Sequence, residues 1–157
     1  MEIKPSPNKK IGGSSKLQIA LIEDLDIFPT TKTQTITSDQ IIFKEGKTWI
    51  DIPVTQGTIK PTIKNKYLAA GKCLDIKIEA DCSEQSPENT LSFEKLDQRK
   101  CIVRIKRLVG NWKVYGTKES FVRFGYIEQE GRRIKDFSGY KIKITGKITP
   151  SPIYIID

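Results

Sequence analysis

The stretch KRLVGNWKVYG, residues 106–116, places a glycine–asparagine pair between two short segments that are rich in apolar and basic residues. Gly110 and Asn111 both tolerate the positive φ that a two-residue hairpin turn requires. The pattern therefore predicts a β-hairpin in which residues 101–109 pair directly with residues 112–117. In this register Val109 lies opposite Trp112, and Lys106 lies opposite Tyr115.

Counting outward from this turn assigns each side chain of the hairpin to a face. The face typical of a core carries one discordant residue, Arg107, beside Ile105, Val109, Trp112 and Val114. The opposite face is basic and partly aromatic, and it carries Arg104, Lys106, Lys113 and Tyr115. Such a face either binds phosphates and stacks a base on Tyr115, or is a solvated strand face whose long side chains deter edge pairing.

Short segments rich in β-branched and aromatic residues recur elsewhere between Gly, Pro, Asn and Asp residues, which is typical of many short strands. Strands are predicted at 17–22, 33–37, 40–45, 48–54, 57–63, 73–80, 101–109, 112–117, 120–128, 139–148 and 153–156. One helix is predicted near 87–98, capped by Ser86 and begun by Pro87, with Leu91 and Leu96 on one apolar stripe. The predicted fold class is mainly β, an antiparallel β-sandwich or partly open β-barrel with one short helix.

Period-two alternation assigns faces in three further segments. In residues 140–149 the core face is predicted to hold Tyr140, Ile142, Ile144 and Ile148. Lysines and threonines alternate with them and are expected in solvent. Residues 74–79 and 50–54 alternate in the same way, and Pro53 predicts that the latter strand lies at an edge or ends in a bulge.

The chain has 157 residues, a length that fits one domain with its own core. Residues 4–16 are rich in Pro, Gly, Ser and Lys, so we expect a flexible N-terminal arm over 1–16 and a single β-rich domain over 17–157. The apolar stretch LQIALI, residues 17–22, is too short and too interrupted for a signal peptide or a membrane span. A soluble protein that is not exported is expected.

The charge of the chain is unevenly distributed. The net charge is +8, but residues 1–98 carry 13 basic and 14 acidic residues, whereas residues 99–157 carry 14 basic and 5 acidic residues. Such asymmetry indicates contact with nucleic acid, an acidic membrane or an acidic protein surface, and does not choose among them.

The chemistry available to the chain is limited. It has no histidine, which excludes Ser-His-Asp and Cys-His nucleophiles. Its three cysteines are odd in number and show no C-x-x-C spacing, so no disulfide framework, metal or cofactor is expected. The acids Glu23, Asp24 and Asp26 fit a solvated loop better than a cation site. A grouping of Asp51, Asp75 and Lys77 as a metal-dependent nuclease is a distant alternative.

The order of features over residues 85–156 adds a resemblance. A Gly-Asn hairpin precedes a polar loop and a closing strand with the pattern Asp136, Gly139, Tyr140, Ile142, Ile144, Gly146, Pro150 and Pro152. This segment resembles a group of small bacteriophage and prophage structural proteins. The resemblance implies a virion- or tail-associated β-protein that assembles into rings or other homo-oligomers and contacts other particle proteins, and it carries over no enzymatic residue.

We therefore expect a non-enzymatic structural protein of a phage or prophage-derived particle, self-assembling through β-edges and charged surfaces. It would reside in the virion, or in the host cytoplasm during assembly, with non-specific DNA contact and no membrane span. The expected basic interface surface comprises Arg104, Lys106, Lys113, Tyr115, Arg123, Arg132, Arg133, Lys141, Lys143 and Lys147. The alternative is an OB-like single-stranded nucleic-acid-binding protein that uses a basic β-face.

Overall fold

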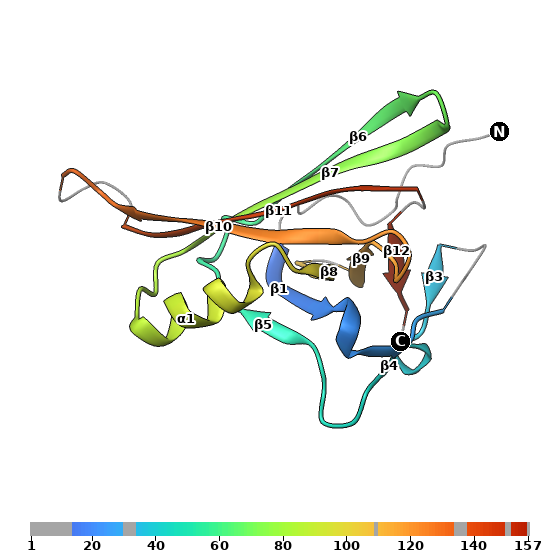
Figure 1. Ribbon diagram of the computed structural model, residues 1–157, viewed down its shortest axis with the longest axis horizontal. Helices are drawn as coiled ribbons and strands as arrows, with labels where there is room; N and C mark the ends of the chain where they lie inside the picture. Colours follow the sequence, from blue (N-terminus) through green and yellow to red (C-terminus); the bar gives the residue numbers. More distant parts are fainter. Residues whose placement is uncertain (1–13, 30–33, 109, 134–137, 150–151, 157) are drawn as a thin grey trace.

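The computed structural model describes residues 14–29, 34–108, 110–133, 138–149 and 152–156, and its fold is mainly β (Figure 1). The strands are β1 (Ser14–Leu21), β2 (Leu25–Ile27), β3 (Thr35–Ile36), β4 (Ile42–Phe43), β5 (Ile50–Ile52), β6 (Lys60–Leu68), β7 (Gly71–Cys82), β8 (Lys100–Arg107), β9 (Trp112–Tyr115), β10 (Val122–Glu130), β11 (Ser138–Ile148) and β12 (Ile153–Ile155). The helix α1 spans Pro87–Leu96, and short 3₁₀ turns cover Ile22–Asp24 and Ser38–Gln40. The predicted fold class is confirmed.

Ten of the strands form one sheet. The sheet divides into two layers at β8. Strand β8 pairs with β1 along one edge, while its other edge pairs first with β10 and then with β9. From there β9, β12 and β3 extend one layer, and β10, β11, β7 and β6 extend the other. Except for the parallel pair of β12 and β3, the strands of this sheet pair antiparallel.

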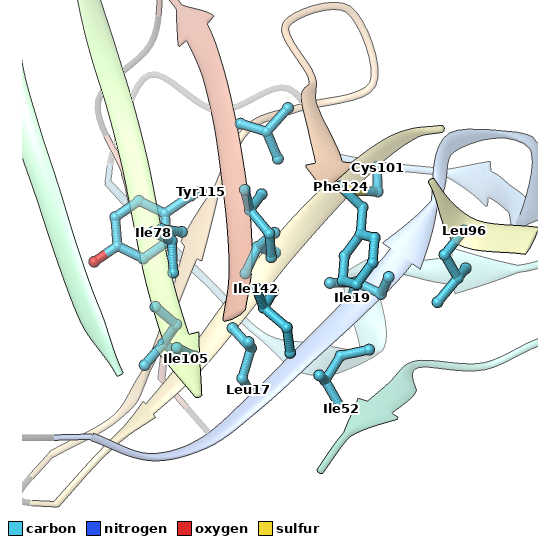
Figure 2. Packing of buried hydrophobic residues seen from close by; sticks show 14 of the residues in the cluster. Leu17, Ile19, Ile52, Ile78, Leu96, Cys101, Ile105, Tyr115, Phe124 and Ile142 are labelled. Carbon is cyan, nitrogen blue, oxygen red and sulfur yellow. The ribbon is translucent and has the colours of Figure 1, made fainter. Parts of the chain in front are cut away.

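The main core lies where the inner faces of the two layers meet (Figure 2). Leu17, Ile19 and Ile52 come from β1 and β5, and they pack against Ile78, Phe124 and Ile142 of the second layer. All six side chains are buried. The predicted alternation in β7 and β11 is confirmed, because the isoleucines point into this core while the lysines between them face outward.

A second, smaller core covers the opposite face of the first layer. It is formed by residues of β1, β8, β9 and β12 together with residues of the segments 22–29 and 34–49: Ala20, Leu25, Ile36, Ile41, Ile102, Val114, Ile153 and Ile155. Trp49 and Trp112 are partly buried at its margin. This double coverage explains why Ile102 and Val103, which are neighbours in β8, are both fully buried.

The helix begins as the sequence predicts, because the Ser86 side chain accepts a hydrogen bond from the Asn89 amide and Pro87 occupies the first turn. The prediction of one stripe through Leu91 and Leu96 is wrong, since Phe93 and Leu96 are buried and Leu91 is 53% exposed. Phe93 packs against Phe124, Tyr126 and Tyr140, with ring centroids 4.8 to 5.8 Å apart. An aromatic cluster on the inner face of β10 and β11 therefore sets the face that α1 buries.

Several predicted boundaries differ from those observed. Strand β6 continues to Leu68, beyond the predicted end at residue 63, because the hairpin of β6 and β7 extends past the core. Strand β1 begins at Ser14, so the last residues of the predicted arm pair with β8, while residues 1–13 lie outside the described residues. Among the described residues strand β5 pairs with β1 alone, and it lies at an edge next to Pro53, as predicted.

Candidate functional site

The hairpin of β8 and β9 forms, but its predicted register is wrong. Lys106 pairs with Trp112 and Val103 pairs with Tyr115, so five residues, 107–111, connect the paired positions instead of two. The shift of three positions is odd, and it moves every side chain of β9 to the other face relative to β8. Residue 109, on which the predicted turn depends, lies outside the described residues.

Tyr115 is the residue most affected by this shift. Its side chain is 2% exposed and belongs to the main core, where Val103 lies opposite it. Burial raises the pKa of Tyr115 to about 12. Burying an aromatic ring of this size contributes about 1.5–3 kcal/mol, which favours the register that places Tyr115 in the core. Tyr115 therefore cannot stack on a base, which corrects its predicted place on an exposed basic face.

Arg104 is held between two indole rings. Its Cζ lies 4.3 Å from the Trp49 ring centroid and 4.2 Å from that of Trp112, and its Nε donates a hydrogen bond of 2.8 Å to Gln18 Oε1. Lys106 lies 5.8 Å from the same Trp112 ring. Stacking of this kind stabilises a half-buried guanidinium and occupies the indole faces on which a ligand would otherwise stack.

Lys113 lies on the inner-face side of the sheet, beyond the core. Its Nζ is 5.3 Å from the Tyr154 ring and 5.5 Å from the Tyr115 ring, and Arg107 is 5.8 Å from the Tyr154 ring. Tyr154 was not among the predicted site residues. No local pattern indicates it, because the pairing of β12 with β9 depends on strand order.

The lysine row of β11 lies on the outer face of the second layer, opposite acidic residues of β7. Lys141 pairs with Asp81, Lys143 with Glu79, and Lys147 with Asp75. Lys77 contributes a further ion pair of 3.0 Å to Glu79, and this contact holds the pKa of Glu79 below its ordinary value. The row is therefore a ladder of alternating charge.

The whole outer face of this layer nevertheless has more cations than anions. The register of β6, β7, β10 and β11 places eight basic residues on it: Lys60, Lys64, Lys66, Lys77, Arg123, Lys141, Lys143 and Lys147. The same register places three acidic residues there, Asp75, Glu79 and Asp81. A polyanion would meet a net positive sheet face without an aromatic platform at its centre.

Arg123 lies on this face near the start of β10, beside the connection from α1 to β8. It donates a hydrogen bond of 2.8 Å to the Gln98 carbonyl oxygen, and Phe121 lies between it and Lys100, with cation–ring distances of 5.6 and 4.8 Å. Gln98 has a positive φ of 59°, the one such non-glycine residue among those described. Its amide donates to the Phe124 carbonyl, which fixes the connection to β10. An open hollow beside it is lined by Gln98, Arg123, Tyr126, Lys143 and Thr145, among others.

The ten predicted surface residues therefore do not form one surface. Arg104 and Lys106 lie on the outer side of the first layer, Lys113 lies on its inner side, and Tyr115 is in the core. Arg123 and the three β11 lysines share the outer face of the second layer. Arg132 and Arg133 follow β10 at the far end of its hairpin and are exposed.

The distant nuclease grouping is not formed. Asp51 lies opposite Gln18 on the outer side of the first layer, whereas Asp75 and Lys77 lie on the outer side of the second, with the core between them. Glu23 pairs with Arg99, and Asp24 lies 4.0 Å from Lys47. These acids serve ion pairs at the surface.

Within the described ranges, no group of three or more His, Cys, Asp or Glu residues could hold a metal ion. No helix in the described part of the chain is long and apolar enough to cross a membrane. Comparisons with protein-family models, with curated proteins and with solved structures find no match for this chain.

Proposed function

We propose that this chain is a non-enzymatic structural protein that assembles into an ordered homo-oligomer, as a component of a phage or prophage-derived particle. The observation that carries the proposal is strand β6. It is nine residues long and ends the ten-stranded sheet, and no strand among the described residues pairs with its second edge. A sheet edge of this length offers its backbone donors and acceptors to another chain.

The position of β6 makes this edge accessible. Its hairpin with β7 projects beyond the core, and residues 64–68 are exposed on both faces (Figure 1). Pro61 removes one backbone donor near the start of the strand, and the lysines discourage unspecific pairing. The lysines on this unpaired edge favour a partner of opposite charge over indiscriminate aggregation.

The resemblance of residues 85–156 to small phage structural proteins supports the particle setting. The positions that carry it have packing roles in the fold: Tyr140 is fully buried against α1, and Gly146 lies against Val122. Its Asp136 and Pro150 lie outside the described residues. An assembly protein needs such a rigid scaffold to present its edges at a fixed angle.

Light scattering coupled to size-exclusion chromatography tests the proposal, with negative-stain microscopy of the same fractions. A discrete oligomer or a regular ring or filament is expected. A protein that stays monomeric at all concentrations up to roughly 100 μM overturns the proposal, because even a weak association with a Kd of about 10 μM would be largely complete there.

A second candidate function, binding of single-stranded nucleic acid, is favoured by the eight basic and three acidic residues on the outer face of the second layer. Fluorescence anisotropy of labelled single-stranded DNA in a salt series tests it. Binding that weakens steeply with salt, and that is lost in Lys141→Glu/Lys143→Glu, is expected if this face binds phosphates. The control variant Lys44→Glu/Lys47→Glu changes the net charge equally, away from this face. No binding at low salt overturns the candidate.

A further inference from the structure

The molecule has two regions of opposite charge, called here its basic end and its acidic end. The basic end is the tip of the β6–β7 hairpin, residues 64–72, which contains three lysines and no acidic residue. The acidic end is residues 81–97 with α1, which contain five acidic residues and one basic residue, Lys95. Figure 1 shows the hairpin tip and α1 on opposite sides of the molecule, with the β10–β11 hairpin extending beyond α1. The opposite charges are therefore local to these two regions.

The basic end exposes apolar groups among its cations. Tyr67 is 76% exposed and Leu68 is 47% exposed. Lys72 lies directly opposite Tyr67 in the hairpin, and Lys66 precedes it. Tyr67 belongs to neither hydrophobic core, so its side chain contributes little to the stability of the fold. Exposed tyrosines of this kind are common anchors of protein interfaces.

The acidic end has a matching exposed apolar residue. Leu91 lies on the outward side of α1, away from the buried Phe93, with Glu88 three residues before it and Glu94 three residues after it. Burial, and after it the carboxylates of Glu94, Asp97 and Glu128, raise the pKa of Tyr126, which packs against Phe93 on the buried side of α1. Gln85 Nε2 donates to Glu128 Oε1, which places the end of β10 beside the start of α1.

We propose that the tip of the β6–β7 hairpin of one copy docks on the acidic outward side of α1 of the next copy. Tyr67 and Leu68 would cover Leu91, and the surrounding lysines would pair with Glu88 and Glu94. The occupant of each surface is a second copy of this chain, since the two surfaces complement one another in both charge and apolar area. The inference rests on the proposed function and names the interface through which it operates.

The contact joins two different surfaces of the chain, so it is heterologous. Repeated head to tail, it leaves one basic and one acidic end free on the growing assembly, which produces a ring if the rotation closes and a filament if it does not. An antiparallel two-fold dimer is the one arrangement that satisfies both contacts between two copies, and light scattering distinguishes it by its mass. A hairpin tip buries less area than the roughly 800 Å² per partner of a stable pair, so we expect assembly to depend on concentration and salt.

Paired charge reversals test this interface. Lys66→Glu/Lys72→Glu makes the tip acidic, and Glu88→Lys/Glu94→Lys makes the helix basic. Each variant alone is expected to be monomeric by light scattering, because its two ends repel one another. A one-to-one mixture is expected to recover the wild-type assembly, since every contact in an alternating chain is again between opposite charges. Lys44→Glu/Lys47→Glu, away from both ends, serves as the matched control and is expected to assemble.

A second pair of variants tests the apolar part of the contact. Tyr67→Ser and Leu91→Ser are each expected to lower the association constant at least about tenfold. The melting temperature of Tyr67→Ser should stay unchanged, because its side chain is 76% exposed. That of Leu91→Ser should fall slightly, because Leu91 is 53% exposed and serine favours a helix less than leucine. Failure of the wild type to assemble overturns the proposed function together with this interface. If the wild type and both charge-reversal variants assemble equally, this interface is overturned but the proposed function is not. Assembly through the unpaired edge of β6 then remains.

Discussion

The backbone of Gly146 in β11 lies so close to Val122 that a Cβ at Gly146 would stand 2.9 Å from the Val122 Cα. Val122 begins β10, the strand that leaves β8 to start the second layer. The contact allows the sheet to turn at this corner. We predict that Gly146→Ala lowers the free energy of unfolding by about 1–3 kcal/mol, because the added methyl forces the two strands apart.

Urea unfolding followed by circular dichroism measures this effect. Lys147→Ala, one residue further along β11, is the control, and its exposed side chain should change stability by less than about 0.5 kcal/mol. Equal stability of Gly146→Ala and the wild type would contradict the close contact between Gly146 and Val122.

The start of α1 is the subject of a second prediction. The Ser86 hydroxyl accepts a hydrogen bond of 3.1 Å from the Asn89 amide, and the Ser86 carbonyl also accepts one from the Tyr140 hydroxyl. Ser86→Ala removes the cap and is expected to cost about 1 kcal/mol of unfolding free energy in urea. Ser92→Ala, on an exposed position of the same helix, should cost less. A reversed order of the two variants would contradict the capping role.

Local patterns in the sequence predicted the elements and their faces. Ile76 and Ile142 were placed in the core by alternation, and Ser86 and Pro87 were placed at the helix start by their chemistry, because each signal needs only neighbouring residues. Leu91 was misplaced, since which side of α1 is buried depends on the aromatic cluster around Phe93.

The candidate site was harder to predict, because its residues are brought together or separated by contacts distant in sequence. Turn propensity at Gly110 predicted a two-residue connection, but the burial of Tyr115 favours a longer one. Alternation in β11 predicts a row of basic residues. The pairing with β7 places an acidic residue opposite each of Lys141, Lys143 and Lys147. The exposed tip at Tyr67 was missed, because β6 was expected to end earlier.

The Arg104 guanidinium between Trp49 and Trp112 is the subject of a third prediction. Lysine keeps the charge at this position but loses the planar group that stacks on both rings. Arg104→Lys is expected to lower the unfolding free energy by about 1 kcal/mol and to change the tryptophan fluorescence of the folded protein. Lys141→Arg, on the outer face of the second layer and away from both rings, is the control and should leave both unchanged. An unaltered spectrum in Arg104→Lys would show that the stack is absent in solution.

Stability at alkaline pH follows from two buried groups. Burial raises the pKa of the Cys101 thiol to about 12 and that of Tyr115 to about 12. Above their ordinary pKa values of about 8.5 and 10, the unfolded chain releases these protons while the folded chain retains them. The stabilisation is therefore complete below about pH 8.5 and is lost progressively as the pH rises toward 12.

Tyr115→Phe isolates one part of this alkaline loss. The variant removes the ionisable hydroxyl but keeps the buried ring, so its unfolding free energy should fall less steeply than that of the wild type between about pH 10 and 11.5. Each group that titrates only in the unfolded chain adds up to about 1.4 kcal/mol per pH unit to the slope. Tyr67→Phe, at an exposed tyrosine, should retain the wild-type slope. Identical slopes for all three proteins in urea titrations would indicate that Tyr115 ionises as readily in the fold as outside it, which its burial against Val103 does not allow.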